Sequence, residues 1–459
     1  MTLDDRALRA SWSAARPDPF WLDQAGRPDA RPALDGDTTA ELAIVGGGFT
    51  GLWTALMAKE RDPERDVLLI DGGRIAGAAT GRNGGFCSAS LTHGESNGRE
   101  RWPDEYEQLH RLGLENLDEI AATVERYGID CGFERTGELS VATRTHELAE
   151  YDASAPDFLD ARALRAEVDS PTYLGGTWDR TGTALIDPAR LAWGLAAAAE
   201  AAGVRIVEHT PVTRLTRTTD GVAVVTDRGT VTAQRVALAT NAFAPLLAGL
   251  RFHTVPVWDY VLMTEPLSPA QLEAIGWSNR QGIADSGNQF HYYRLTADNR
   301  ILWGGYDAIY HFGRRIKPEH EHRDATYQAL AHNFFTTFPQ LEGLHFSHRW
   351  GGVIDTCTRF CAFFGTSHRG RVAYATGYTG LGVGASRFGA NVVLDLLGGT
   401  PTERTRLTMV RRRPLPFPPE PFAWIGITIT TWALKRADRT GRRNLWLRVL
   451  DRFGLGFDS

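Results

Sequence analysis

The sequence contains very little lysine and very little cysteine. Of the 50 basic residues only Lys59, Lys317 and Lys435 are lysines, so a catalytic or Schiff-base lysine has three candidates. The four cysteines include no CxxC pair, and no second cluster completes a set of metal ligands. The sequence therefore predicts neither a disulfide framework nor a bound metal.

Long apolar runs are also missing. No stretch approaches the roughly 18 apolar residues of a membrane-spanning helix, and residues 1–20 lack the apolar core of a signal peptide. We therefore expect a cytoplasmic protein. The net charge of −5 lacks the basic excess of a general nucleic-acid binder, so no nucleic-acid partner is expected. At 459 residues, of which 42% are hydrophobic, the chain is long enough for two or three globular domains.

Glycine, in contrast, is abundant, with 48 residues, and several of them form a motif. A short apolar run over residues 41–45 leads into Gly46-Gly-Gly-Phe-Thr-Gly51, and residues 50–61 then have the pattern of a helix. A second apolar run over residues 66–71 ends on Asp71, 20 positions after Gly51. This order of elements is typical of a dinucleotide-binding βαβ unit.

Each part of this unit has a physical role. Gly46 permits the tight turn, Gly48 lets the backbone approach a pyrophosphate, and Gly51 allows close packing of helix on strand. The helix N-terminus supplies N–H groups and the positive end of a dipole. Asp71 can accept hydrogen bonds from a ribose. The unit alone does not distinguish FAD from NAD.

Helix-like and strand-like segments alternate along the rest of the chain. Helices are predicted over residues 101–127, 188–203, 320–338 and 384–397. Strands are predicted over residues 204–208, 212–217, 222–226, 235–240, 348–354 and 372–376, with others in the aromatic stretch 253–310. The return of the βαβ pattern after residue 187 indicates a discontinuous nucleotide domain. The first 40 residues, rich in Pro, Asp and Arg, are predicted to be an irregular arm.

The segment after the second strand carries a family resemblance. Ile75-Ala-Gly-Ala-Ala-Thr-Gly-Arg-Asn-Gly-Gly85 resembles the GxSGRNGG stretch of the D-amino-acid oxidase and sarcosine oxidase superfamily, whose members are FAD-dependent. The γ-glutamylputrescine-oxidase-like branch is the most similar. Further matching segments follow in family order, namely Asp187-Pro188, Ala239-Thr-Asn-Ala242, residues 293–305 and Gly377-Tyr-Thr-Gly-Leu-Gly-Val383. The resemblance thus covers residues 40–400.

The resemblance implies an α/β fold, α+β overall, with a Rossmann-like FAD-binding domain and an antiparallel-sheet substrate domain, both discontinuous. The expected segments are an N-terminal arm (1–40), three FAD-binding parts (41–95, 181–250 and 346–400), two substrate or cap parts (96–180 and 251–345) and a C-terminal helical extension (401–459).

The resemblance also implies how FAD is held. The glycines of the first motif lie at the pyrophosphate, Asp71 on the ribose and Val212 at the adenine. The helix that begins after Gly380 directs its positive dipole end at the flavin ring. The full expected set is Gly46, Gly48, Phe49, Thr50, Gly51, Asp71, Gly72, Arg74, Ala79, Thr80, Gly81, Arg82, Asn83, Gly84, Gly85, Val212, Thr240, Asn241, Gly377, Gly380, Leu381, Gly382 and Val383. Trp350 or Gly351 aligns where sarcosine oxidases attach the flavin to a cysteine, so non-covalent FAD is expected.

The implied reaction is oxidation of a C–N bond in a small amine. A hydride passes from the carbon next to nitrogen to flavin N5, the imine hydrolyses to an aldehyde or ketone, and O2 is reduced to H2O2. Two alternatives stay open: a D-amino-acid or glycine-type dehydrogenase that passes electrons to a quinone or other carrier, and a non-catalytic flavin-binding partner subunit. Sarcosine oxidases have a lysine that promotes the reaction with oxygen at the position where this chain has Gly384. The sequence therefore leaves open whether the enzyme is an oxidase or a dehydrogenase.

Aromatic rings and histidines are the candidates for the substrate pocket. They are His93, Trp258, Tyr260, His291 and Tyr293. Rings beside the flavin would attract a cationic amine, and His93 could accept its proton. Within strand 290–295, Phe290 and Tyr292 share one face and His291 and Tyr293 the other. Alternation does not say which face lines the pocket, and packing in the core is the alternative for each ring.

The final segment, residues 401–459, is not explained by cofactor binding. Residues 424–434 are mostly apolar and precede Lys435, Arg436 and Arg439. The first interpretation is a helix packed on the body of the protein. The alternative is an amphipathic element that contacts a membrane surface or a partner.

Overall fold

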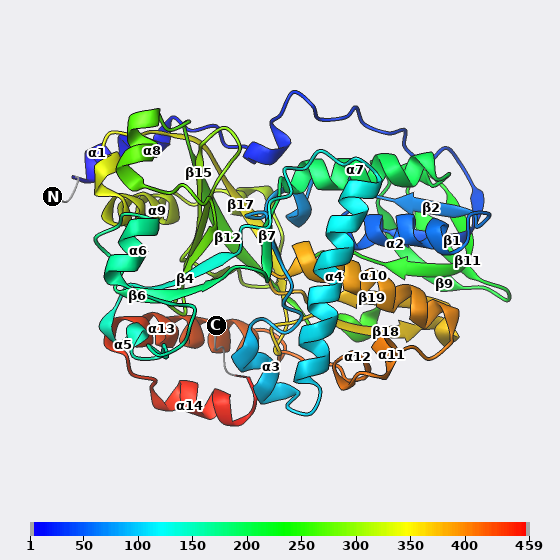
Figure 1. The fold of residues 1–459 in the computed structure, drawn as a ribbon. Coiled ribbons are helices and arrows are strands. Elements are labelled where there is room, and N and C mark those ends of the chain that lie inside the picture. Colours follow the sequence, from blue (N-terminus) through cyan, green and yellow to red (C-terminus); the bar gives the residue numbers. More distant parts are fainter. Residues whose placement is uncertain (1–3, 456–459) are drawn as a thin grey trace.

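The computed structural model describes residues 4–455, and two large sheets organise them (Figure 1). The first sheet is mixed. Its strand order is β18 (Phe363–Ser367), β19 (Val372–Thr376), β11 (Thr230–Leu238), β1 (Thr38–Val45), β2 (Val67–Ile70) and β8 (Arg205–Val207). In addition, β10 (Val222–Thr226) pairs with β11, and β9 (Val212–Arg217) pairs with β10. The second is mainly antiparallel, with the order β16 (Ile309–Tyr310), β12 (Val255–Thr264), β15 (Ile301–Gly305), β14 (His291–Leu295), β13 (Gly282–Asp285), β4 (Glu138–Ala142), β6 (Gly175–Asp179) and β5 (Phe158–Asp160), and with β17 (Phe346–Thr356) on β12. The expected α/β fold class is confirmed.

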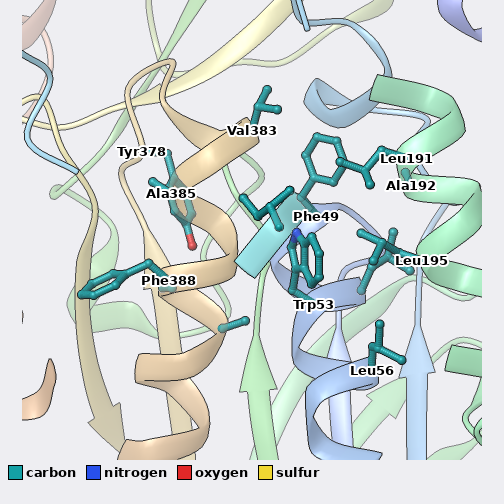
Figure 2. Close-up of a cluster of buried hydrophobic side chains, with 14 of the residues drawn as sticks. Phe49, Trp53, Leu56, Leu191, Ala192, Leu195, Tyr378, Val383, Ala385 and Phe388 are labelled. Carbon is teal, nitrogen blue, oxygen red and sulfur yellow. The ribbon is translucent and has the colours of Figure 1, made fainter. Parts of the chain in front are cut away.

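The centre of the first sheet is parallel, because β1 lies between β2 and β11 in parallel register. Helix α2 (Phe49–Arg61) lies beside it and packs against both α7 (Pro188–Ala201) and α10 (Gly382–Gly398), and α4 (Tyr106–Arg126) packs on α10. Figure 2 shows Phe49 and Trp53 of α2 between Leu191 and Leu195 of α7 on one side and α10 on the other. This packing fixes the N-termini of α2 and α10 at the same end of the sheet.

The second sheet buries one face under helices. Helix α9 (Asp324–Thr337) packs on β12 and β15, and its Phe334 joins Tyr293 and Trp303 of the sheet in one aromatic core. The opposite face of the sheet turns toward the first sheet. This second face is the one available to a ligand.

The first 40 residues contain a helix where the sequence predicts an irregular arm. Helix α1 (Asp5–Ser13) begins at Asp4, whose carboxylate accepts the Ala7 N–H at 2.7 Å. The buried Trp12 of α1 donates its indole N–H to Gln328 Oε1 on α9 at 3.1 Å. Tertiary packing on α9 therefore stabilises a short helix that local composition does not indicate.

Strand β17 corrects one expected boundary. The sequence assigns residues 346–400 to the FAD-binding part, but β17 pairs along its whole length with β12 of the second sheet. The chain returns to the first sheet only at β18. An apolar strand pattern gives no information about which sheet it joins, because both sheets bury apolar side chains.

The last part of the chain is helical. Short helices α11 (Glu403–Arg406) and α12 (Thr408–Arg411) precede α13 (Phe422–Thr440) and α14 (Leu445–Arg452), which lie along the edge of the molecule below β4 and β6 in the view of Figure 1. Within residues 4–455, none of the helices combines the length and the apolar character that crossing a bilayer requires.

Candidate active site

A cavity of about 1810 Å³ lies between the two sheets. It extends from the carboxyl ends of β1 and β2, past the N-termini of α2 and α10, to the open face of the second sheet. Ordinary ligand pockets hold roughly 300–1,000 Å³, so this cavity has room for a dinucleotide together with a substrate.

The turn after β1 can be built only from glycine. Gly46 has φ +112°, and a Cβ there would lie 2.4 Å from Ala239 O. A Cβ on Gly51 would lie 1.8 Å from Gly46 O, so Gly51 packs behind the turn and does not line the cavity. Gly48 precedes α2 without a side-chain cap. The Phe49 N–H donates to Thr80 Oγ1 at 3.1 Å, and the N–H groups that follow it in the first turn of α2 remain available to an anion. This end of the cavity fits a pyrophosphate.

Asp71 follows β2 at the cavity wall. Its carboxylate accepts the Gly47 N–H at 2.6 Å and the Gly73 N–H at 2.7 Å. Burial raises the pKa of Asp71, while these backbone bonds act in the opposite direction. Asp71 is thereby held beside the glycine turn, at the place where a ribose hydroxyl can reach it.

A network of side chains shapes residues 79–85. The Asn83 amide donates to Ala79 O and Thr80 O, and its carbonyl oxygen accepts the Gly85 N–H at 2.8 Å. The indole of Trp21 donates to Asn83 O at 2.8 Å. The buried Arg294 donates to Ile186 O, behind Gly85, at 2.6 Å. The segment is therefore fixed from both sides before any ligand binds.

The charge of Arg82 is paired with another side chain of the protein. Its guanidinium forms an ion pair with Glu321 at 2.7 Å and donates to Gly351 O at 3.0 Å. The indole of Trp350 donates to Arg82 O at 2.9 Å. Arg82 thus lines the cavity and also ties this segment to the second sheet.

The loop before α10 is organised by a buried acid. Asp355 accepts the N–H of Gly377, the Tyr378 N–H at 3.2 Å and the Thr376 hydroxyl at 3.1 Å. Burial raises the pKa of Asp355 to about 6. Helix α10 then begins at Gly382 without a side-chain cap, beside the cavity. Its positive dipole end is available to the ligand that fills the cavity.

Most expected cofactor residues line this cavity. Those that do are Gly46, Gly48, Phe49, Thr50, Asp71, Gly72, Arg74, Ala79, Thr80, Arg82, Asn83, Gly84, Val212, Thr240, Asn241, Gly380, Leu381, Gly382 and Val383. Gly51, Gly81, Gly85 and Gly377 lie behind its wall. A Cβ on Gly81 would lie 2.4 Å from Ala76 O, and one on Gly85 2.3 Å from Ile186 O, so these glycines permit close backbone packing.

An aspartate and a tyrosine face the cavity from the second sheet. The Tyr292 hydroxyl on β14 donates to Asp259 Oδ2 on β12 at 2.5 Å. Burial raises the pKa of Asp259 to about 6 and that of Tyr292 well above its usual value. The Tyr292 ring fits between two glycines, because a Cβ on Gly84 would lie 2.7 Å from it and one on Gly304 2.5 Å.

The part of the cavity that lies against the second sheet is lined by acidic side chains. Glu138 on β4 joins Asp259 in the lining, and burial raises the pKa of Glu138. Among residues 4–455, the arginines of the lining are Arg74 and Arg82, and both lie in the segment that follows β2. A cationic group is the ligand that the part against the second sheet favours.

The expected substrate residues divide between the two faces of the second sheet. His93 and Trp258 line the cavity, and burial lowers the pKa of His93. Tyr260, His291 and Tyr293 are a correction, since in the described chain they face the aromatic core and lie outside the cavity lining. His291 pairs with Asp285 at 2.7 Å, and Tyr293 shares a hydrogen bond with Tyr173 at 2.7 Å. Alternation places Phe290 and Tyr292 on the cavity side instead.

Gly384 occupies the position where sarcosine oxidases have a lysine that promotes the reaction with oxygen, and there is no space for a side chain at this position. A Cβ on Gly384 would lie 2.0 Å from Ser88 O of β3 (Phe86–Ser88). The side-chain amide of Asn116 also donates to Gly384 O at 3.0 Å. Helix α10 therefore packs directly on β3 at this point.

A family model described as "FAD dependent oxidoreductase" matches residues 41–396. The chain belongs to this family of FAD-dependent oxidoreductases. It is therefore an enzyme that uses FAD to oxidise amines or amino acids, as the resemblance in the sequence implies. The glycine turn and the uncapped N-termini of α2 and α10 fit such a dinucleotide.

Individual relatives and structures agree with this assignment. The chain is 32% identical over 380 residues to gamma-glutamylputrescine oxidoreductase of Escherichia coli, which covers 80% of this chain and 85% of the relative. It is 27% identical to the probable oxidoreductase OrdL of Haemophilus influenzae, over 83% of this chain and 88% of the relative. The structure of glycine oxidase from Geobacillus kaustophilus superimposes with a TM-score of 0.66 at 21% identity, over 82% of this chain and 99% of that one.

Proposed function

We propose that this enzyme oxidises the C–N bond of a small amine and not of an amino acid. The observation that carries the proposal is the pair Asp259 and Tyr292 on the open face of the second sheet. A buried carboxylate attracts an ammonium group and repels the carboxylate that every amino acid carries. The gamma-glutamylputrescine oxidoreductase of Escherichia coli, a relative named for an amine conjugate, supports this choice.

FAD, when bound, supplies the acceptor for a hydride from the carbon next to nitrogen. The residues of the chain bind and orient the amine. The carboxylate of Asp259 holds the nitrogen, and the Tyr292 hydroxyl keeps that carboxylate in place through its hydrogen bond. The amine must lose its proton before oxidation. His93 lines the same cavity and is the proposed acceptor of this proton. Burial lowers its pKa, so the imidazole is neutral before the transfer.

The experiment is a substrate screen on the purified holoenzyme without oxygen. We expect primary or secondary amines to bleach the flavin absorbance, and D-amino acids and glycine to leave it unchanged. Asp259→Asn should raise KM for the amine about tenfold or more, because the charge of the carboxylate is lost. Glu150→Gln is the control, since Glu150 is an exposed carboxylate of the same lining. Bleaching by amino acids alone would refute the proposal.

Molecular oxygen is the proposed electron acceptor, with H2O2 as its product. With a bleaching amine in hand, air should restore the flavin absorbance and yield one H2O2 per amine oxidised. A flavin that stays reduced in air but recovers with a quinone would identify a dehydrogenase instead. The closed site at Gly384 gives this second outcome a structural basis, because the lysine that sarcosine oxidases use cannot be accommodated there.

A further inference from the structure

Helix α13 is apolar on two opposite sides. One side, which includes Ala423, Ile427 and Leu434, lines the cavity. The other side carries exposed apolar side chains, among them Ile429 and Trp432, the latter 54% exposed. A helix normally buries an apolar side against another part of the protein or a partner. The outer side of α13 therefore requires an apolar environment that the described chain does not supply.

Helix α14 extends this exposed surface. It packs on α13 through Leu447, which is buried with Ala433 and Ala437, and the Trp446 indole donates to Thr430 Oγ1 at 2.9 Å. The exposed apolar residues of the two helices that lie outside the cavity lining form one apolar patch: Trp424, Ile425, Ile429, Trp432, Leu445, Val449 and Phe453. Figure 1 shows α13 and α14 side by side at one edge of the molecule. A single exposed apolar residue is ordinary, but a contiguous patch of this kind marks an interaction surface.

The same two helices carry a concentrated positive charge. Residues 422–455 contain seven lysine or arginine residues and two aspartates, although the whole chain has a net charge of −5. Asp438 accepts hydrogen bonds from Asn288, and Asp451 pairs with Arg443. The exposed arginines of the segment are Arg436, Arg439, Arg442, Arg448 and Arg452. The surface around the apolar patch is therefore cationic.

We propose that the apolar patch docks on an anionic lipid bilayer, with α13 and α14 lying in the plane of the interface. Tryptophan and phenylalanine suit the headgroup boundary, and arginines are attracted to anionic lipids. A second copy of this chain fits less well, because two such surfaces would bring like charges together.

Polar contacts fix helix α13 to the rest of the protein. Lys435 Nζ lies 2.6 Å from Asp307 Oδ1, and Asp438 accepts the backbone N–H of Asn288 at 2.9 Å and of Gln289 at 3.1 Å. These bonds tie α13 to the loops of the second sheet. Because the inner side of α13 lines the active-site cavity, docking would place that cavity next to the lipid surface.

The test is flotation of the full-length holoenzyme with lipid vesicles. We expect it to float with vesicles of phosphatidylcholine and phosphatidylglycerol and to stay behind with phosphatidylcholine alone. Trp432→Ser combined with Phe453→Ser should lower the bound fraction about tenfold or more. Neither residue lines the cavity, so FAD content and amine-dependent bleaching should be unchanged, which separates this test from that of the proposed function.

A matched pair of charge variants controls for net charge. Arg439→Gln with Arg448→Gln should weaken binding to the anionic vesicles. Arg214→Gln with Arg217→Gln makes the same charge change on β9, at the other end of the molecule in Figure 1, and should not. Equal weakening by both pairs would overturn the proposal. So would failure to float with anionic vesicles, or a dimer that Trp432→Ser with Phe453→Ser converts to monomer.

Discussion

The Thr50 hydroxyl donates a hydrogen bond to the Tyr378 hydroxyl at 2.9 Å, joining two segments that are 328 residues apart in the chain. Thr50 lies in the first turn of α2, beside the glycine turn, and Tyr378 lies in the loop before α10; both line the cavity. Both side chains are buried. This bond holds the N-termini of the two helices in register across the cofactor site.

Breaking that bond should weaken FAD binding. Tyr378→Phe leaves the Thr50 hydroxyl without this acceptor, and we expect about a 5- to 10-fold rise in Kd, consistent with about 1 kcal/mol for such a bond. Thr50→Val should have a similar effect. Titration of the apoprotein with FAD, followed by quenching of flavin fluorescence, measures both. The double variant is the control, because it should cost little more than either single change. Fully additive losses would mean that the two hydroxyls do not act together.

The ionisation of Asp259 should make the folded protein less stable as the pH rises. Its pKa is about 6 in the fold against 3.8 when unperturbed, because burial disfavours the charged form. The folded state therefore binds the proton more tightly, and stability is lost between about pH 4 and pH 6. Asp259→Asn should remove that loss, worth on the order of 3 kcal/mol at neutral pH. Urea unfolding of both proteins over this range measures the difference.

The two proteins should be about equally stable near pH 4, where Asp259 is protonated. If the difference in unfolding free energy between the two proteins were the same at all pH values, Asp259 would not be the group that causes the pH dependence. Tyr292→Phe is the companion variant, since removing the donor should raise the pKa of Asp259 further and enlarge the loss.

The cofactor half of the site could be predicted from the sequence, because it depends on local backbone geometry. Gly46 adopts a positive φ, and Gly48 brings the backbone close to the cavity. Both positions require glycine, so the motif can be recognised in the sequence by its fixed spacing. The substrate half depends on which face of a strand is open. Asp259 shares a strand face with the apolar Val257 and Val261, so its role in the site is evident only once that face is known to line the cavity.

Two other features depend on contacts between distant segments. Asp355 organises the loop before α10 from a strand of the other sheet, and no local pattern indicates that role. The inner side of α13 closes the cavity over the second sheet, although the sequence identifies only an apolar helix beyond the family segment. Tertiary packing decided both.

Gly304→Ala should lower activity without affecting the cofactor. A Cβ there would lie 2.5 Å from Tyr292 Cζ and 2.6 Å from its hydroxyl oxygen, so the ring must move away from Asp259. We expect kcat/KM for the amine to fall about tenfold, with overpacking costing about 1–3 kcal/mol of stability. Gly304 lies outside the cavity lining, so FAD content should not change. Gly249→Ala is the matched control, because its added Cβ meets nothing within 4 Å. Unchanged kcat/KM in Gly304→Ala would show that the position of the Tyr292 hydroxyl does not matter.

Denaturation should release FAD from the protein. The four cysteines are free and buried, and none of them belongs to the cavity lining formed by residues 4–455. Cys357, the cysteine nearest in sequence to the family's attachment point, donates its thiol to Cys361 O at 3.1 Å, and burial raises its pKa, which disfavours the reactive thiolate. Acid precipitation of the holoenzyme should therefore leave a colourless pellet and all the FAD in the supernatant. Cys357→Ser should bind the same amount of FAD as the unaltered protein. A yellow pellet that Cys357→Ser turns colourless would instead reveal a covalent bond, and would require the loop that carries Cys357 to open toward the flavin.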